Sequence, residues 1–121
     1  MTAAPLDRLR AICLAFPEAT ERETWGQATF RVRDKIFAMA GEGSTRSRLA
    51  VSCKARPGLQ PALVEAAPDR FFVPAYVGPK GWIGVYLGDE TDWDELADLV
   101  EESYRMTAPK RVAALLDKQT R

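Results

Sequence analysis

The side chains best suited to bind a ligand lie between residues 76 and 87, which read Tyr-Val-Gly-Pro-Lys-Gly-Trp-Ile-Gly-Val-Tyr-Leu. Gly-Pro-Lys-Gly is typical of a turn, because glycine adopts positive φ without steric cost and proline fixes its own φ. The residues after it alternate as in a strand, where successive side chains point to opposite faces. Trp82 and Tyr86 therefore share one face, with Lys80 at the turn beside it. An aromatic and cationic face of this kind suits a ligand with flat rings and negative charge.

Basic residues are concentrated earlier in the chain. The stretch from Arg22 to Arg56 has eight basic and three acidic residues, although the whole chain has no net charge. Zero net charge argues against strong non-specific affinity for DNA, whereas the local excess of positive charge leaves weaker binding open.

Histidine is absent from the sequence. It is the commonest general base and the commonest transition-metal ligand, so its absence excludes Ser-His-Asp, Cys-His and zinc–histidine sites. Two cysteines alone cannot form a structural zinc site. We therefore expect no catalytic residues, no metal site and no cofactor, and predict that the protein is not an enzyme. Cys13 and Cys53 lie in apolar patterns, which indicates buried free thiols and no disulfide.

The length and composition are those of one soluble domain. The 121 residues are 46% hydrophobic and 28% charged, which is ordinary for a globular protein with its own core. We expect a single domain over residues 1–121. No apolar run approaches the ~18 residues of a membrane span, and Asp7, Arg8 and Arg10 lie where a signal peptide would have its apolar core. We therefore expect a cytoplasmic protein with no membrane partner.

Hydrophobic periodicity predicts the elements of the first half of the chain. They are a helix, a hairpin that turns at Asp34, a loop, a strand and a short helix, over residues 5–16, 24–40, 41–47, 48–54 and 57–67 respectively. The residues between the first helix and the hairpin are polar, and we interpret them as a link.

The second half is expected to contain a short extended piece over 71–73, a strand over 82–87 and two helices. Thr91 and Asp94 resemble a capping box, with Asp in place of the usual Glu, and predict the start of a long helix. The last helix carries an apolar face within 112–116. This order of elements predicts an α+β fold, a small antiparallel sheet with helices packed on one face.

Alternation divides the strand residues between the two faces of this sheet. Towards the helices we expect the apolar set Phe30, Val32, Leu49, Val51, Ile83 and Val85. On the opposite face we expect Arg31, Arg33, Arg48, Lys54, Trp82 and Tyr86. A slip of one residue in the register would exchange the two sets.

Six segments stand out along nearly the whole chain: LRAICLAFPEATE (9–21), WGQATFRV (25–32), KIFA (35–38), LAVSCK (49–54), YVGPKGWIGV (76–85) and LVEESY (99–104). In this order they resemble the MmcQ/YjbR-like family of small bacterial proteins. The resemblance implies a compact double-wing fold, topologically close to the frataxin-like (CyaY-like) fold. The family is generally labelled DNA-binding, a label that rests largely on fold analogy, and fold alone does not define function. The resemblance supplies no agreed catalytic residues to carry over to this sequence.

The first functional hypothesis is nucleic-acid binding, with DNA as the partner. Basic side chains would contact phosphates, while Trp82 and Tyr86 would stack on unpaired bases. The candidate residues are Arg31, Arg33, Lys35, Arg48, Lys54, Lys80, Trp82 and Tyr86. The competing interpretation is an ordinary solvated sheet face, since charged residues alternate outward on any half-exposed strand.

Two other interpretations remain open. A pocket formed by Tyr76, Lys80 and Trp82 would suit a small anionic or aromatic ligand, and the protein would then be a small-ligand or protein-interaction module with no role on nucleic acid. The acidic residues of 89–102 would hold a hard cation weakly. These acidic residues are also explained by the helix dipole and by solvation of an outer helix face.

Overall fold

The computed structural model describes residues 4–24, 26–42 and 48–119. Its elements, in chain order, are α1 (Pro5–Leu14), β1 (Ala19–Thr24), β2 (Gln27–Val32), β3 (Lys35–Glu42), β4 (Leu49–Cys53), α2 (Leu59–Ala66), β5 (Phe71–Phe72), the 3-10 helix η1 (Gly78–Lys80), β6 (Ile83–Tyr86), α3 (Trp93–Thr107) and α4 (Lys110–Gln119). Of the loop predicted at 41–47, Gly41 and Glu42 belong to β3, and 43–47 lie outside the described residues.

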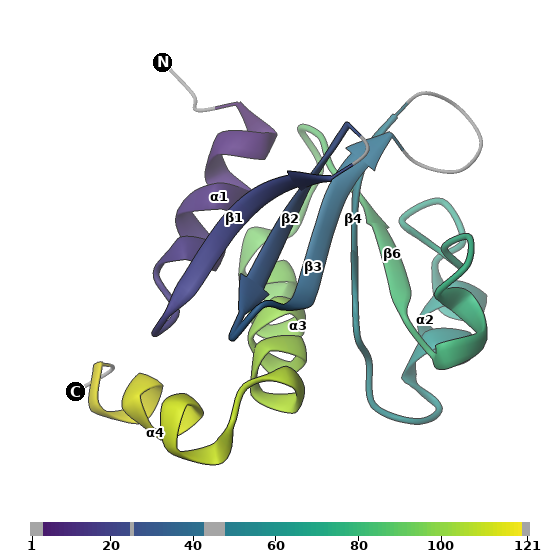
Figure 1. Ribbon diagram of the computed structural model, residues 1–121. Helices are drawn as coiled ribbons and strands as arrows, with labels where there is room; N and C mark the ends of the chain where they lie inside the picture. The colour runs from purple at the N-terminus through teal and green to yellow at the C-terminus, as the bar shows by residue number, and fades with distance from the viewer. Residues whose placement is uncertain (1–3, 25, 43–47, 120–121) are drawn as a thin grey trace.

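The strands form one six-stranded sheet in the order β1-β2-β3-β4-β6-β5, and every pair of neighbours is antiparallel (Figure 1). The register places Val51 of β4 opposite Ala40 of β3 and opposite Val85 of β6. The predicted α+β class with an antiparallel sheet is therefore confirmed.

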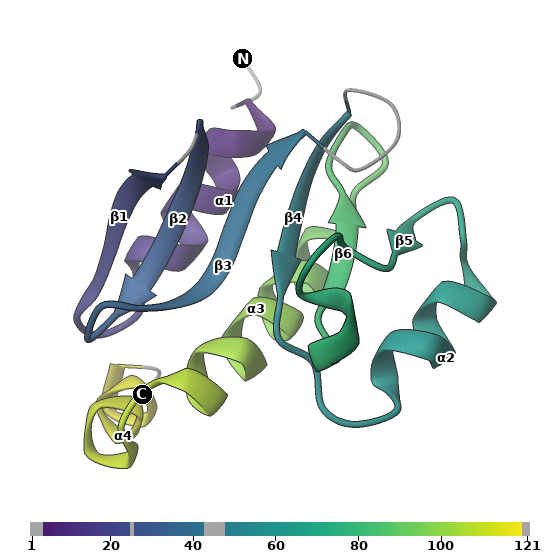
Figure 2. The same cartoon turned by 45° about the vertical axis from the view of Figure 1, so that its right-hand side comes forward.

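The helices cover one face of this sheet. Helices α1 and α3 lie side by side behind the strands, and α4 packs against α3 (Figure 1). Helix α2 lies at the β5 edge (Figure 2). Residues of α2 and α3 together line a small pocket. Within the described residues no α-helix covers the opposite face, so the predicted one-sided packing is confirmed.

The hydrophobic core fills the space between the sheet and the helices. The predicted core residues Phe30, Val32, Val51, Ile83 and Val85 are all buried. Leu49 is only half-buried, because it pairs with Glu42 at the end of the ladder. Both cysteines are buried free thiols, as expected. Burial raises the pKa of the Cys53 thiol to about 12 and also raises that of Cys13.

Three aromatic rings join the helical layer to the sheet. The ring of Tyr104 on α3 stacks on Phe16 at 4.8 Å and meets Phe37 of β3 edge-on at 5.4 Å, both measured between centroids. The Tyr104 hydroxyl donates a hydrogen bond to the Pro17 carbonyl at 2.7 Å. This buried polar group is therefore satisfied inside the core.

The polar link predicted after the first helix is wrong, because residues 19–24 form the edge strand β1. Its sequence, Ala-Thr-Glu-Arg-Glu-Thr, has no apolar alternation. Glu21 instead faces α1 and accepts two hydrogen bonds from the Arg10 guanidinium, at 2.6 and 2.9 Å. An ion pair takes the place that an apolar contact usually has, so hydrophobic periodicity could not reveal this strand.

The long helix begins one residue later than predicted. Asp92 is its N-cap, and the Asp92 Oδ1 atom accepts a hydrogen bond from the Glu95 N–H at 3.0 Å. The Thr91 hydroxyl instead accepts from the Gly88 N–H at 2.8 Å, which closes the turn after β6. Both side chains bind backbone N–H groups, but only Asp92 caps the helix.

A hydroxyl group of α3 completes the sheet where β3 and β4 separate. The two strands pair as far as Ala38 and Cys53, and the next rung in this register would join Phe37 to Lys54. Ser103 Oγ lies in that position, where it accepts from the Lys54 N–H at 2.9 Å and donates to the Phe37 carbonyl at 2.6 Å. One side chain thus satisfies a backbone group on each strand.

We predict that Ser103→Ala destabilises the fold by about 2 kcal/mol, because it leaves a buried N–H and a buried carbonyl without partners. Urea unfolding followed by tryptophan fluorescence measures the loss. Thr107→Val is the matched control, since the Thr107 hydroxyl bonds only the Ser103 carbonyl four residues earlier in the same helix, and its loss should cost well under about 1 kcal/mol. Equal effects of the two substitutions would contradict this role of Ser103.

Candidate ligand-binding site

The face of the sheet that the helices leave uncovered is mainly apolar and aromatic in its centre. Alternation in the observed register sends the following side chains to this face: Thr29 and Arg31 of β2, Met39 of β3, Ala50 and Ser52 of β4, Phe72 of β5, and Tyr86 of β6. Positive charge therefore does not predominate in the centre of this face, while the predicted Arg31 and Arg48 lie on the same face beside the central residues.

A cleft of about 390 Å³ lies on this face. Its floor is formed by strand residues and one rim by the segment after β5; the lining consists of Thr24, Gln27, Thr29, Ile36, Met39, Gly41, Ala50, Ser52, Phe72, Pro74, Ala75, Tyr76 and Val77. The floor is therefore mainly apolar, with the Ser52 hydroxyl as a polar group within it, and the other strand hydroxyl and amide groups lie at the β1–β2 end. No charged side chain belongs to this lining within the described residues.

An aromatic row forms one side of the cleft. The Phe72 ring lies flat against Gly84, where a Cβ atom would come within 2.4 Å of the ring, so only glycine fits beneath it. Phe72 also meets Tyr86, with 4.6 Å between ring centroids. The Arg48 guanidinium lies over the other end of the row, 4.3 Å from the Tyr86 centroid, at a distance typical of cation–π contact.

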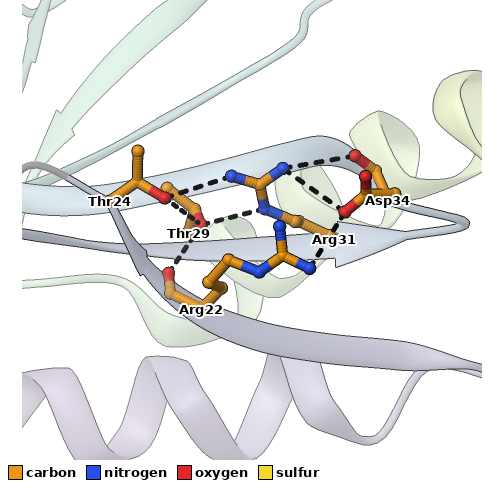
Figure 3. Close-up of polar contacts among 5 residues, drawn as sticks. All are labelled: Arg22, Thr24, Thr29, Arg31 and Asp34. Atoms are coloured by element: carbon orange, nitrogen blue, oxygen red, sulfur yellow. Dashed lines mark hydrogen bonds and ion pairs between the residues drawn. The ribbon is translucent and has the colours of Figure 1, made fainter.

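The polar end of the cleft is built around Arg31 (Figure 3). Arg31 Nε donates to Thr29 Oγ1 at 3.2 Å, and Arg31 Nη2 donates to Thr24 Oγ1 at 3.1 Å. The Thr29 hydroxyl in turn donates to the Arg22 carbonyl at 2.6 Å. The Arg31 side chain is only 14% exposed. Thr24 and Thr29 line the cleft, and Arg31 supports them from behind.

Positive charge predominates at this end. Asp34 is the acidic partner of both arginines, with Oδ1 at 3.2 Å from Arg22 and at 3.6 Å from Arg31 (Figure 3). One carboxylate facing two guanidinium groups leaves one positive charge in excess. The Thr29 hydroxyl already donates its proton to the Arg22 carbonyl, whereas the Thr24 hydroxyl accepts from Arg31 and can still donate. Together with the excess positive charge, this donor favours a ligand group that accepts hydrogen bonds or carries negative charge.

The structure corrects the predicted position of Trp82. Its side chain is 7% exposed, and the residue lies before β6 and not within it. Its carbonyl accepts a hydrogen bond from Gln60 Nε2 of α2, which holds the segment in place. The indole was predicted to lie open beside the basic residues, but the residue is buried. It therefore offers no surface on which a base could stack.

The predicted basic residues are distributed over two ends of the sheet. Arg33 and Lys35 lie at the turn between β2 and β3, while Lys54 follows β4 and Lys80 belongs to η1. Arg48 begins β4 at the opposite end, beside Tyr86. Of the predicted set, the structure thus brings together Arg48 and Tyr86, and it places Arg31 at the polar end of the cleft.

Arg33 is engaged by an acidic neighbour. Its Nε atom donates to Glu18 Oε1 at 2.6 Å, and this hydrogen bond holds the pKa of the Glu18 carboxyl below its ordinary value. Both side chains are 43% exposed, so the pair contributes little to stability in solvent. A phosphate would compete with Glu18 for the Nε and Nη2 groups of Arg33.

The pocket predicted from Tyr76, Lys80 and Trp82 is not formed by those three residues. Tyr76 lines the observed cleft, whereas Lys80 and Trp82 are not among its described lining residues. The residues that complete the site were missed for identifiable reasons. Thr24 belongs to the unrecognised strand β1. Alternation did indicate that Thr29 shares a face with Arg31, but a threonine alone gave no reason to choose it.

The acidic stretch 89–102 forms the β6–α3 connection and the first part of α3. Arg70 contacts Glu95, and Arg56 donates to Glu102 at 2.7 Å. Among the residues that the structure describes, no three acidic or cysteine side chains gather as potential metal ligands.

A single antiparallel sheet, covered by helices on one face and hollowed by a cleft on the other, defines a small α+β protein with one open sheet face. The YjbR family model matches residues 14–106. The chain therefore belongs to the YjbR family, which confirms the resemblance found in its sequence.

A solved structure supports the same fold. The crystal structure of Deinococcus radiodurans protein DR2400, which contains a DUF419 domain, is similar to this chain with a TM-score of 0.71 and 23% sequence identity. The similarity covers 84% of this chain and 76% of the other. No curated protein gives a significant match. Within the described residues, none of the helices combines the length and apolar character needed to cross a bilayer.

We predict that Arg33→Gln raises the pKa of Glu18 towards the ordinary carboxyl value of 4.5, because the hydrogen bond to the charged carboxylate is lost. NMR titration of the Glu18 side-chain carbons measures it. In the wild-type protein the pair stabilises the fold above that ordinary pKa, and the contribution is lost as pH falls through the lower folded value. Lys35→Gln, two residues away, is the matched control and should leave the Glu18 titration unchanged. An unaltered pKa in Arg33→Gln would contradict the pairing.

Proposed function

We propose that this protein binds a small molecule in the sheet cleft, and that the molecule has a flat apolar ring system with an anionic or hydrogen-bond-accepting group at one end. The observation that carries the proposal is the cleft itself. Its volume of about 390 Å³ falls in the ~300–1,000 Å³ range of small-molecule sites. Its apolar floor and few polar groups are also typical of such sites.

The arrangement of the walls supports one orientation of the ligand. Rings would lie on Met39 and Ala50, beside the Phe72 ring, where they would bury apolar area against the sheet. The accepting group would then point to the Thr24 hydroxyl, at the end where Arg31 supplies positive charge. This orientation places the apolar rings on the apolar floor and the accepting group at the positively charged end.

Binding is better supported than catalysis. The described lining of the cleft offers hydroxyl and amide groups but no carboxylate, thiol or amine. A hydroxyl nucleophile is activated by a general base beside it, and the described lining supplies no carboxylate or imidazole for that role. We therefore propose a binding protein and assign no catalytic residue.

The second candidate is the binding of unpaired nucleic acid, which the aromatic row favours. Arg48, Tyr86 and Phe72 follow one another on the open face and end at the cleft. Successive bases stack on aromatic rings of this kind, while an arginine meets the backbone. Duplex DNA fits less well, since the other basic residues are distributed around the sheet and Trp82 is buried.

We predict that 1-anilinonaphthalene-8-sulfonate, a fused aromatic anion, binds the cleft with micromolar affinity and that Ser52→Phe weakens this binding at least about tenfold. The phenyl ring would occupy the floor that the probe needs. Probe fluorescence during titration gives the affinity, and circular dichroism confirms that each variant is folded. Ser52→Ala, which leaves the cleft open, should bind as the wild type does. Wild-type affinity in Ser52→Phe would overturn the proposal.

The polar end is tested with a second probe. N-phenyl-1-naphthylamine has the same rings without the sulfonate group. Arg31→Gln should weaken binding of the sulfonate probe about threefold or more, because it removes the charge behind Thr24 and Thr29, and should change binding of the neutral probe by less than about twofold. Equal losses for both probes would show that the charge has no such role.

The nucleic-acid candidate makes a separate prediction. Fluorescence anisotropy with a short single-stranded DNA should show binding that weakens as salt rises. Tyr86→Leu should weaken it about tenfold, because each stacked base contributes ~1–3 kcal/mol. Lys35→Ala, outside the row, should change it little. No salt-sensitive binding of single strands, or equal loss in both variants, would remove this candidate.

A further inference from the structure

The rim of the cleft contains a strained turn with an exposed aromatic ring at its tip. The Val77 N–H donates to the Ala75 carbonyl at 2.7 Å, and Tyr76 between them has φ of +66°. A three-residue turn with positive φ at its centre is the rare and strained form of the γ-turn. At this positive φ the Cβ atom of tyrosine causes steric strain, which glycine would avoid.

This turn is held firmly on both sides. Pro74 is buried, and its carbonyl accepts from the Gly78 N–H at 2.9 Å. Gln60 of α2 donates to the Gly78 carbonyl at 2.9 Å. The Val73 side chain lies where a Cβ atom on Gly78 would be, 2.5 Å away. The Val77 carbonyl also accepts from the Lys80 N–H at 3.0 Å. The residues on either side of Tyr76 are thus anchored, and Tyr76 lies between them.

The Tyr76 side chain is 96% exposed although the residue lines the cleft. A large ring at the edge of an apolar cleft gains nothing from this position in the free protein. It becomes favourable when the ring can cover apolar surface. Strain at a cleft rim that the neighbouring structure enforces is typical of segments that change on binding.

We propose that Tyr76 is a clamp residue, whose ring closes over a bound ligand as the Ala75–Val77 turn relaxes; this inference rests on the proposed ligand-binding function. The ligand's rings would lie between the floor of the cleft and the Tyr76 ring. Closure buries the ring and releases the strain of the turn in one movement. Tyr76 thus slows ligand release more than it speeds ligand entry.

The experiment separates the ring from the backbone strain with three substitutions. Tyr76→Phe keeps the ring, Tyr76→Ala removes it and keeps a Cβ atom at positive φ, and Tyr76→Gly removes both. Each variant is titrated with 1-anilinonaphthalene-8-sulfonate, its dissociation rate is measured by stopped flow, and its thermal midpoint is recorded without probe.

Tyr76→Phe should bind within about twofold of the wild type, whereas Tyr76→Ala and Tyr76→Gly should lose about tenfold in affinity, mainly through faster dissociation. Tyr76→Gly should also raise the thermal midpoint by about 3 °C relative to Tyr76→Ala, because glycine relieves the strain.

The failure of the clamp and the failure of the cleft are distinguishable. Wild-type affinity and dissociation rate in Tyr76→Ala, together with weak binding in Ser52→Phe, would overturn the clamp and leave the cleft as the binding site. Probe binding that is absent, or that Ser52→Phe does not affect, would overturn both. Equal thermal midpoints in the Gly and Ala variants would overturn the strain on which closure depends.

Discussion

The structure depends on one constraint, that every second residue of a strand leaves the core. Helices α1 and α3 bury one set of side chains, among them Phe30, Val51 and Ile83. The other set must be compatible with water or find its own cover. In this protein the Phe72 ring covers Gly84, the Arg48 guanidinium covers Tyr86, and the loop after β5 forms one rim of the cleft. The cleft is the part of the second face that remains uncovered.

Much of the fold follows from the sequence alone, because its buried elements have the expected apolar period. Helices and central strands were predicted close to their observed bounds, and the core face was predicted correctly, with Leu49 at the start of β4 packed against the core but only partly buried. The edge strand β1 was missed, since its inward position at Glu21 is satisfied by Arg10 and not by apolar contact. A hydrophobic pattern detects strands that bury apolar side chains, and it cannot detect a strand whose inward side chain forms an ion pair.

The candidate site was less predictable, because the position of a charged side chain depends on hydrogen-bond partners far away in the sequence. Arg31 was correctly placed on the open face, but its hydrogen bonds to Thr24 and Thr29 depend on a strand that the pattern did not show. Arg33 meets Glu18, fifteen residues earlier. Trp82 is buried, and its carbonyl accepts from Gln60, 22 residues earlier. A strand period distinguishes two faces, but it cannot say which face a neighbouring loop will cover.

The Ser103 hydroxyl has a consequence for the opposite side of the sheet. It takes the place of a direct rung between Phe37 of β3 and Lys54 after β4, so α3 is hydrogen-bonded to both chains at the point where the two strands separate. The same two strands carry part of the cleft on the open face, where Met39 of β3 pairs with Ser52 of β4. A single side chain of the helical layer thus fastens, from behind, the two strands that a ligand would rest on.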